Sequence, residues 1–429
     1  MTNSPYSKPN ILFILTDQQS ASMMSCTGNK YLSTPAMDSL AKEGVRFERA
    51  YCSDPICVPS RFSIFTGKYP SEAGFRGNNP AQENAFVPES IYKHGMGWEL
   101  KKAGYEVAYG GKQHFPLFKA EDIGFDVISK DERDILAQDC VNFISQKREL
   151  PFFLVASFIN PHDICHMAIR DNAREGEIEK LWLDNWIKND ALEIKDLEWA
   201  LQMPEGMDED TFFNTVCPPL PDNFEVQENE PESVRTHQAE RPFKKRAREI
   251  YTERQWRLHR WAYCKLTEKV DAQIGQVLKA LRDIGQVENT VVIFTSDHGD
   301  MDAAHRMEHK ELLYEEACRI PLIISQPGIT SAGEVNRDNL VSNGLDIITT
   351  IYDYAGINKP EDLKGRSLRK LSEGIRESEW RTELLIEGCN GKAIVTERYK
   401  YVSYDEGENK EQVYDLVNDP GESKNQMKD

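Results

Sequence analysis

Apolar and mostly apolar runs of strand length recur along the chain, and patterns with helical spacing separate them. Runs without a polar residue at every second position are typical of strands buried on both faces of a parallel sheet. The predicted strands lie at residues 11–16, 105–109, 152–159 and 290–296. The predicted helices lie at residues 34–44, 91–103, 131–147 and 263–284. This alternation predicts an α/β fold with a large, mostly parallel sheet covered by helices on both faces.

Polar residues follow each predicted strand. They are Asp17, Lys112, His162 and Asp297. Any one of them could be an ordinary solvated strand end. Because parallel sheets gather ligands outside the carboxyl ends of their strands, all of them together predict one functional site at that edge.

The end of the chain has a different pattern. After a predicted helix at 346–355, short strand-like segments separated by turns lie at residues 384–387, 392–396, 399–404 and 412–416. These segments predict a small antiparallel sheet. We therefore expect a catalytic domain over residues 1–365 and a small C-terminal subdomain over 366–429.

Residues 165–261 lose this periodicity and are acidic, with prolines at 218–221. We interpret the segment as an insertion over the active face. Its tryptophans either stack on sugars or pack in a helical core, which is the commoner use. They are Trp182, Trp186, Trp199, Trp256 and Trp261. The basic residues at 241–248 are interpreted as a solvated helix face.

Composition narrows the class of function. The 429 residues are 39% hydrophobic and 29% charged, which is typical of a globular enzyme, and no apolar run is long enough to span a membrane. A net charge of −19 argues against nucleic acid as a partner and favours a small anionic substrate held by a local cationic cluster. Nine scattered cysteines and an amino terminus without a signal-peptide pattern predict a cytoplasmic protein, or a periplasmic one if a leader has been removed.

The segment from Cys57 to Gly67 predicts a short helix with Cys57 at its amino end and Pro59 in its first turn. Backbone N–H groups and the helix dipole favour negative charge there, either on a nucleophile or on an anionic substrate. The alternative is a small buried cysteine before an ordinary helix. The order of the residues, Cys-x-Pro-Ser-Arg, favours the first interpretation.

The motifs of the chain together resemble those of the type I sulfatases of the alkaline phosphatase superfamily. They are Asp17-Gln18, Cys-x-Pro-Ser-Arg at 57–61, Gly111-Lys112-Gln113-His114, Asn160-Pro161-His162, Ser296-Asp297-His298-Gly299, Lys310, and Tyr-Asp-Leu-x-x-Asp-Pro-x-Glu at 414–422. The resemblance covers nearly the whole chain. It implies an α/β/α sandwich with an alkaline phosphatase-like mixed sheet and a smaller C-terminal domain.

The resemblance also implies two cofactors. Cys57 would be oxidised to formylglycine by a formylglycine-generating enzyme or an anaerobic sulfatase-maturating enzyme. A divalent metal, usually Ca²⁺, would be held by Asp17, Gln18, Asp297, His298 and residue 57. Hard oxygen ligands suit such a cation, which neutralises charge on the sulfate oxygens.

The remaining site residues take their roles from the same resemblance. In the family one hydroxyl of the hydrated formylglycine attacks sulfur, and the other then expels sulfate. Arg61 and Lys112 would hold the charge of the diol and the sulfate, and His114 would accept the proton during release. His162 and Lys310 would contact the sulfate and protonate the leaving oxygen.

Two positions depart from the common pattern. Gln18 stands where many members have aspartate, and His298 stands where many have asparagine. Both resemble phosphonate monoester hydrolases of the same superfamily, and they make Mn²⁺ or Mg²⁺ admissible. We expect a sulfuric ester hydrolase acting on a small sulfated saccharide. The alternatives are a phosphonate or phosphate diester hydrolase and an inactive protein that binds sulfated glycans. The sequence leaves open the sugar, the sulfate position, O-sulfate or N-sulfate, and the oligomeric state.

Overall fold

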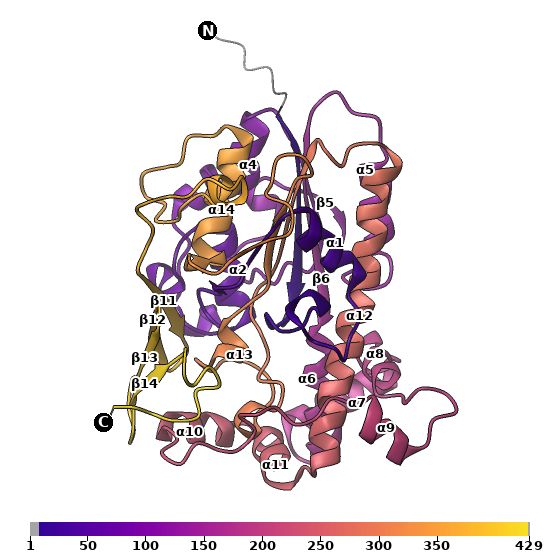
Figure 1. Ribbon diagram of the computed structural model, residues 1–429, viewed down its shortest axis with the longest axis vertical. Helices are drawn as coiled ribbons and strands as arrows, with labels where there is room; N and C mark the ends of the chain where they lie inside the picture. The colour runs from indigo at the N-terminus through magenta and orange to yellow at the C-terminus, as the bar shows by residue number, and fades with distance from the viewer. Residues whose placement is uncertain (1–7, 428–429) are drawn as a thin grey trace.

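A mixed eight-stranded sheet forms the centre of the protein in a computed structural model that describes residues 8–427 (Figure 1). Its strands lie in the order β5 (Asp126–Ser129), β4 (Glu106–Gly111), β6 (Phe152–Pro161), β1 (Asn10–Asp17), β7 (Thr290–Ser296), β8 (Leu322–Ser325), β2 (Val45–Phe47) and β9 (Glu334–Asn336). The strands from β5 to β7 are parallel, and β8 is antiparallel to β7 and β2. The predicted α/β class with a mostly parallel mixed sheet is confirmed.

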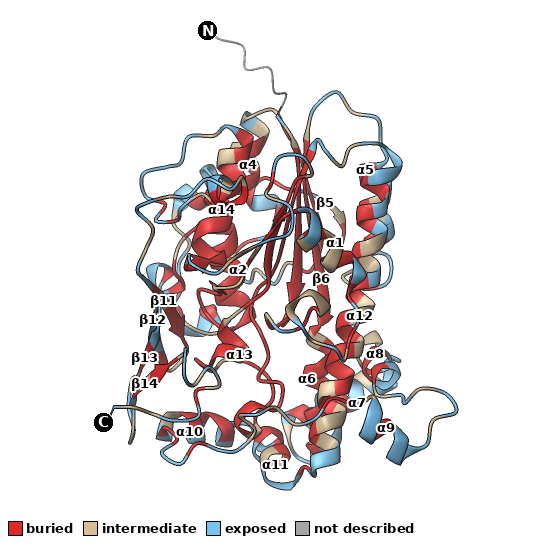
Figure 2. Cartoon of the chain, in the orientation of Figure 1, coloured by how far each residue is buried: buried red, intermediate tan, exposed pale blue. Residues whose placement is uncertain are grey.

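Helices cover both faces of this sheet. Side chains of β1 alternate between two cores, with Phe13 in one and Ile14 in the other. The first face packs against α2 (Cys57–Thr66), α4 (Met96–Lys102) and α14 (Asn343–Ala355). The second packs against α1 (Pro35–Glu43), α5 (Leu136–Ile144) and α12 (Glu253–Asp283). Figure 2 shows the central strands fully buried and the outer helices buried only on their inner sides.

Three predicted helices differ from those observed. The helix expected at 131–147 is shorter at both ends, because α5 begins at Leu136 and ends at Ile144. The helix expected at 91–103 is divided into α3 (Glu89–Lys93) and α4 at Gly95, where a Cβ atom would lie 2.6 Å from Ile123. The helix expected at 263–284 begins ten residues earlier, because Thr252 and Gln255 form a capping box. Short elements complete this region, namely β3 (Ala50–Tyr51), β10 (Val341–Ser342), α13 (Glu315–Cys318) and α15 (Arg369–Ser372).

The predicted insertion is helical. It contains α6 (Cys165–Asn172), α7 (Ile178–Lys188), α8 (Leu192–Ala200), α9 (Glu209–Thr215), α10 (Glu232–Glu240) and α11 (Pro242–Ile250), which lie beyond the carboxyl ends of the parallel strands (Figure 1). Trp256 and Trp261 are buried in the core, whereas Trp182 and Trp199 are exposed. The interpretation of residues 241–248 as a solvated face is wrong for Lys244, which is buried and bonded to Glu311.

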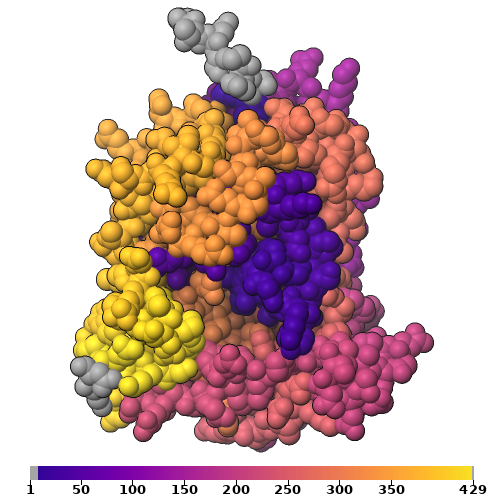
Figure 3. Space-filling view, in the orientation of Figure 1, coloured from indigo at the N-terminus to yellow at the C-terminus, as the bar shows by residue number. Residues whose placement is uncertain are grey.

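The predicted antiparallel sheet at the end of the chain is confirmed. It is formed by β11 (Glu383–Gly388), β12 (Gly391–Thr396), β13 (Tyr399–Tyr404) and β14 (Glu411–Asp415). This sheet and the insertion lie side by side at one end of the molecule (Figure 3), where Asn390 donates to Ser233. The domain limits 1–365 and 366–429 stay predictions.

Among the described helices, not one is long and apolar enough to cross a membrane. The expectation about a leader rests largely on residues 1–7, which lie outside the described residues.

Candidate active site

The register of the central strands brings two carboxylates together. Thr16 on β1 is paired with Ser296 on β7, so Asp17 and Asp297 follow at the same edge of the sheet. The backbone reverses at Gln18, whose φ is 66° and whose N–H donates to Asp297 Oδ1 at 3.1 Å. Both aspartates are fully buried. The predicted clustering at the carboxyl ends of the strands is therefore present.

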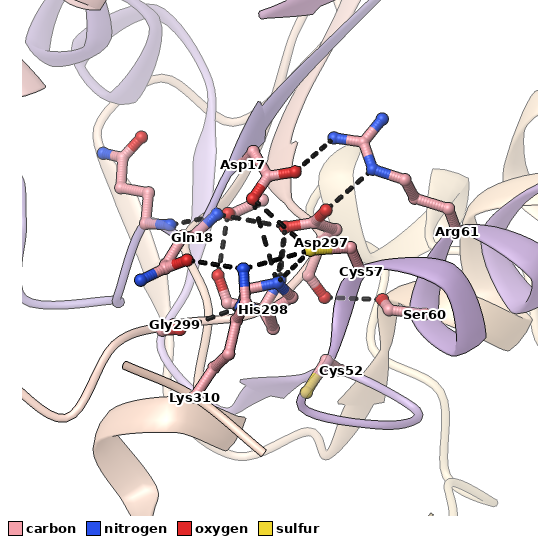
Figure 4. A network of polar contacts seen from close by, with 12 residues as sticks. Asp17, Gln18, Cys52, Cys57, Ser60, Arg61, Asp297, His298, Gly299 and Lys310 are labelled. Atoms are coloured by element: carbon pink, nitrogen blue, oxygen red, sulfur yellow. Dashed lines mark hydrogen bonds and ion pairs between the residues drawn. The ribbon is translucent and has the colours of Figure 1, made fainter. Parts of the chain in front are cut away.

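Arg61 reaches these carboxylates from the second turn of α2, and it is also fully buried. Its Nε lies 2.8 Å from Asp297 Oδ2, and its Nη2 lies 3.2 Å from Asp17 Oδ2 (Figure 4). Nη1 donates to the Lys112 carbonyl at 3.0 Å and to Ser157 Oγ at 2.9 Å. Burial lowers the pKa of Arg61, but both carboxylates outweigh burial and raise it. The guanidinium thus remains charged and holds the two aspartates in place.

Cys57 is the first residue of α2 and lies in the middle of the cluster (Figure 4). Its Sγ lies 3.2 Å from His298 Nε2, 3.2 Å from Lys310 Nζ and 3.8 Å from Asp17 Oδ1. Burial and Asp17 raise the pKa of the thiol, but cationic neighbours, led by Lys310, hold it well below its usual range. Residue 57 therefore lies where negative charge is stabilised, as its place at a helix start predicts.

Two lysines complete the cationic side of the site. Lys112 Nζ lies 2.5 Å from Asp17 Oδ2, and Lys310 Nζ lies 2.7 Å from Gln18 Oε1. Burial raises the pKa of Asp17, but Lys112 leads the charged neighbours that hold it well below its usual range. His162 is half-buried, whereas the other members of the cluster are buried, so His162 is the member with the most contact with solvent and marks the open side of the site.

His114 is placed differently from the other predicted residues. It is exposed, has a φ of 50°, and among the described residues no hydrogen bond or ion pair joins it to the cluster. The structure therefore does not bring His114 into the buried network, and its role stays a prediction.

Sequence reasoning missed two neighbours of Gln18. Its Nε2 donates to Asp300 Oδ2 at 2.6 Å, and its Oε1 accepts from the Cys165 thiol at 3.0 Å. Asp300 lies three residues after Asp297, so the tight turn around Gly299 was an available signal. Cys165 carries no such signal, because only the fold brings α6 to the end of β1.

The residues present fit a divalent cation. One ligand atom from each of Asp17, Cys57, Asp297 and His298 lies within 4.8 Å of the others. Asp17 and Asp297 each use Oδ2 for Arg61, which leaves their Oδ1 atoms facing His298 Nε2 at 3.8 and 3.6 Å. Two carboxylate oxygens and an imidazole nitrogen around one point form a donor set that hard or borderline divalent metals accept.

Comparison with known proteins agrees with this site. The Sulfatase family model matches residues 9–357, and the model of the N-sulphoglucosamine sulphohydrolase C-terminal region matches residues 303–429. The chain belongs to the sulfatase family. It is an enzyme of the alkaline phosphatase-like fold, and the inferred resemblance is confirmed.

Individual relatives align with nearly the whole length of the chain. A Delta 4,5-hexuronate-2-O-sulfatase of Bacteroides thetaiotaomicron is 30% identical, over 98% of this chain and 85% of that protein. A solved 2-O GAG sulfatase is 28% identical with a TM-score of 0.80, over 99% and 88% of the two chains. A sulfatase-fold structure bound to D-glucosamine-2-N,6-O-disulfate, described as its substrate, is 25% identical with a TM-score of 0.69, over 98% and 93%.

The phosphonate monoester hydrolase of Agrobacterium radiobacter is a more distant neighbour. It is 20% identical with a TM-score of 0.71, over 97% of this chain and 91% of that one. This likeness shows a shared fold and gives no support of its own to a phosphonatase activity.

Proposed function

We propose that this sulfatase hydrolyses a sulfate ester on a small saccharide of the kind found in glycosaminoglycans. The observation that carries the proposal is the buried group of Asp17, Cys57, Asp297 and His298, with Lys112 and Lys310 beside it. The 2-O-sulfatase relatives support a saccharide O-sulfate as the substrate.

Residue 57 carries the nucleophile in this proposal. Matured to formylglycine, it supplies an aldehyde hydrate, and the Cys57 Sγ atom stands in for a hydrate oxygen. Lys310 and His298 lie beside that atom, each at 3.2 Å, and favour negative charge on it. The maturing partner is a formylglycine-generating enzyme or an anaerobic sulfatase-maturating enzyme.

A divalent metal bound by Asp17, Gln18, Asp297 and His298 supplies charge neutralisation at a sulfate oxygen. Ca²⁺ is the ion we favour, and Gln18 and His298 keep Mn²⁺ and Mg²⁺ as candidates. Arg61 keeps the aspartates oriented, and Lys112 balances the charge of Asp17. His162, at the open side, is the side chain best placed to give a proton to the departing sugar oxygen.

The test uses protein produced with and without a maturing enzyme, loaded with each metal in turn. Peptide mass spectrometry should show formylglycine at position 57 in the active preparation, and chelation should abolish sulfate release from sulfated saccharides. Cys57→Ala is the matched control. Full activity in protein that carries only unmodified cysteine at 57 would contradict the proposal.

A phosphonate monoester hydrolase is the second candidate, because Gln18 and His298 occupy two of the metal positions. Parallel turnover of a sulfate monoester and a phosphonate monoester by the same matured preparation separates the two activities. We expect kcat/KM to be higher for the sulfate ester. The opposite ranking would assign the chain to the second candidate.

A further inference from the structure

His166 lies one helical turn beyond His162 and has no role in the chemistry described above. His162 begins a short turn of 3₁₀ helix, His162–Ile164, that continues into α6. The two imidazole rings are 5.8 Å apart between centroids, and His166 is only 8% exposed. The turn thus places the buried His166 directly beside His162.

Both imidazoles carry a ring nitrogen without a partner. The Nδ1 atoms of His162 and His166 are buried, and neither has a hydrogen-bond partner among the described residues. A buried polar atom without a partner costs free energy, which a ligand that supplies the missing hydrogen bond recovers. Unpaired nitrogens on two neighbouring rings, one of which belongs to His162 of the active site, therefore indicate a place for substrate.

The surroundings of His166 are charged and aromatic. Arg133, which is 7% exposed, binds Asp163 with Nη2–Oδ1 at 2.6 Å and Nε–Oδ2 at 3.3 Å, and it also lies 3.1 Å from Glu132 and 4.0 Å from Glu193. His166 Nε2 lies 3.7 Å from the same Asp163 Oδ1. On its other side the ring meets the half-buried Trp186, with 4.6 Å between centroids.

A metal ion is disfavoured at this second cluster, although ligand atoms of His162, Asp163 and His166 lie within 4.8 Å of one another. Arg133 already engages both oxygens of Asp163. Burial lowers the pKa of His166, and His162 and Arg133 lower it further, as expected in a region of positive potential. Such a region attracts an anion and repels a cation.

We propose that His166 binds a second anionic group on the sugar that carries the scissile sulfate. The inference rests on the proposed function, because His162 must face that sulfate for His166 to face its neighbour on the ring. The shared chemistry is an anionic oxygen group, either a carboxylate or a second sulfate. Arg133 holds Asp163, Lys310 and Lys112 of the active site add positive potential at His166, and Trp186 supplies an apolar surface beside the sugar.

The test compares kcat/KM of the matured, metal-loaded enzyme on sugar sulfates that differ only in the second group. The neutral set consists of glucose monosulfates, in which the second group is an uncharged hydroxyl. The carboxylate set consists of glucuronate sulfated at the same ring positions. The second-sulfate set consists of glucose disulfates. Wild-type enzyme should prefer at least one anionic set by about tenfold or more, since hydrogen bonds to charged groups are the stronger ones. Equal or better turnover of the neutral set would overturn the inference.

His166→Ala should lose about 10- to 100-fold on the preferred anionic set, the size of a lost hydrogen bond to a charged group. The same variant should hydrolyse neutral sugar sulfates and nitrophenyl sulfate nearly as well as wild type. His166→Asn, which keeps a donor near the Nδ1 position, should recover part of the loss. Equal losses on every substrate, with an unchanged melting temperature, would contradict a role in selectivity.

Two further comparisons keep the inference apart from the proposed function. Trp186→Ala, which removes the apolar surface beside the sugar, should lower kcat/KM on sugar sulfates more than on nitrophenyl sulfate. Trp182→Ala, which removes an exposed tryptophan of the same helix, should change neither and serves as its control. If no sulfate ester is turned over, including nitrophenyl sulfate, the proposed function itself fails. If nitrophenyl sulfate is turned over and the anionic preference is absent, only the inference fails.

Discussion

Gln18 donates its carboxamide N–H to Asp300, with 2.6 Å between Nε2 and Oδ2. Asp300 is fully buried, so this hydrogen bond fixes which end of the amide is the oxygen. The carboxamide oxygen consequently accepts hydrogen bonds from Lys310, which also contacts Cys57, and from the Cys165 thiol.

Asp300→Ala should therefore weaken metal binding, because the Gln18 amide loses the partner that orients it. Outer partners of metal ligands are typically worth about 10- to 100-fold in metal affinity. We expect the midpoint of a metal titration to rise by that factor, with kcat at saturating metal little changed. Asp338→Ala, at an exposed position, is the control. An unchanged midpoint for Asp300→Ala would show that Gln18 is oriented by other contacts.

The aspartates of the site show what the sequence pattern could and could not predict. Strand periodicity placed Asp17 and Asp297 at the carboxyl ends of two predicted strands, because a buried parallel strand is recognisable from its continuous apolar run. It left open that each is a solvated strand end, whereas both are 0% exposed. Their burial depends on Arg61, which comes from a helix distant in sequence, and periodicity carries no information on such a partner.

Other parts of the fold were beyond the pattern for similar reasons. The short strands β2 and β9 have too few residues for a period to be detected. The start of α12 at Glu253 is set by the Thr252 capping box, which lies inside a segment interpreted as irregular. His114 matched a motif in sequence, but its exposed position is decided by the path of the loop after β4.

A buried group of charges joins the C-terminal tail, strand β13 and helix α13. Lys400 is fully buried, and its Nζ lies 3.0 Å from Glu422 Oε1 and 3.3 Å from Glu315 Oε1. Glu422→Ala should lower the free energy of unfolding by about 3 kcal/mol, because it leaves a buried ammonium incompletely compensated. Urea unfolding measures the change. Lys392→Ala, which breaks a half-exposed pair, should cost less than about 1 kcal/mol, and a similar cost for both variants would contradict this account.

A buried histidine should make the stability depend on pH. His259 is 0% exposed, neither ring nitrogen has a partner among the described residues, and burial lowers its pKa to about 3. The folded chain therefore binds fewer protons than the unfolded chain below pH ~6.5, so stability falls as pH falls from there toward 3.

From pH 7.5 to 5 this one group should remove about 2 kcal/mol from the free energy of unfolding. His259→Leu should lose that share of the pH dependence, as measured by chemical unfolding at both pH values. An identical pH dependence in wild type and His259→Leu would exclude His259 as its source.

The last prediction separates protonation of the leaving group from binding of the sulfate, which His162 or Lys310 could each perform. Lys310 Nζ contacts Gln18 Oε1 and Cys57 Sγ. Burial lowers the pKa of Lys310, but Cys57 and other acidic neighbours raise it overall, so this ammonium group loses its proton less readily than an ordinary lysine. His162 lies at the open side, where the sugar leaves. Burial, Lys310 and Lys112 lower its pKa to about 3 in the ligand-free site, and a bound sulfate anion acts in the opposite direction.

A sugar alcohol needs a proton as it leaves, whereas nitrophenolate leaves nearly unaided. General acid catalysis is worth about 10²- to 10⁴-fold, so His162→Ala should lose that factor on a sugar sulfate and far less on nitrophenyl sulfate. Lys310→Ala should lose similar factors on both substrates, because the sulfate charge it neutralises is common to them. The measurement is kcat/KM for both substrates in both variants. Equal losses for His162→Ala would remove it as the acid, and an unequal loss confined to Lys310→Ala would transfer the role to that lysine.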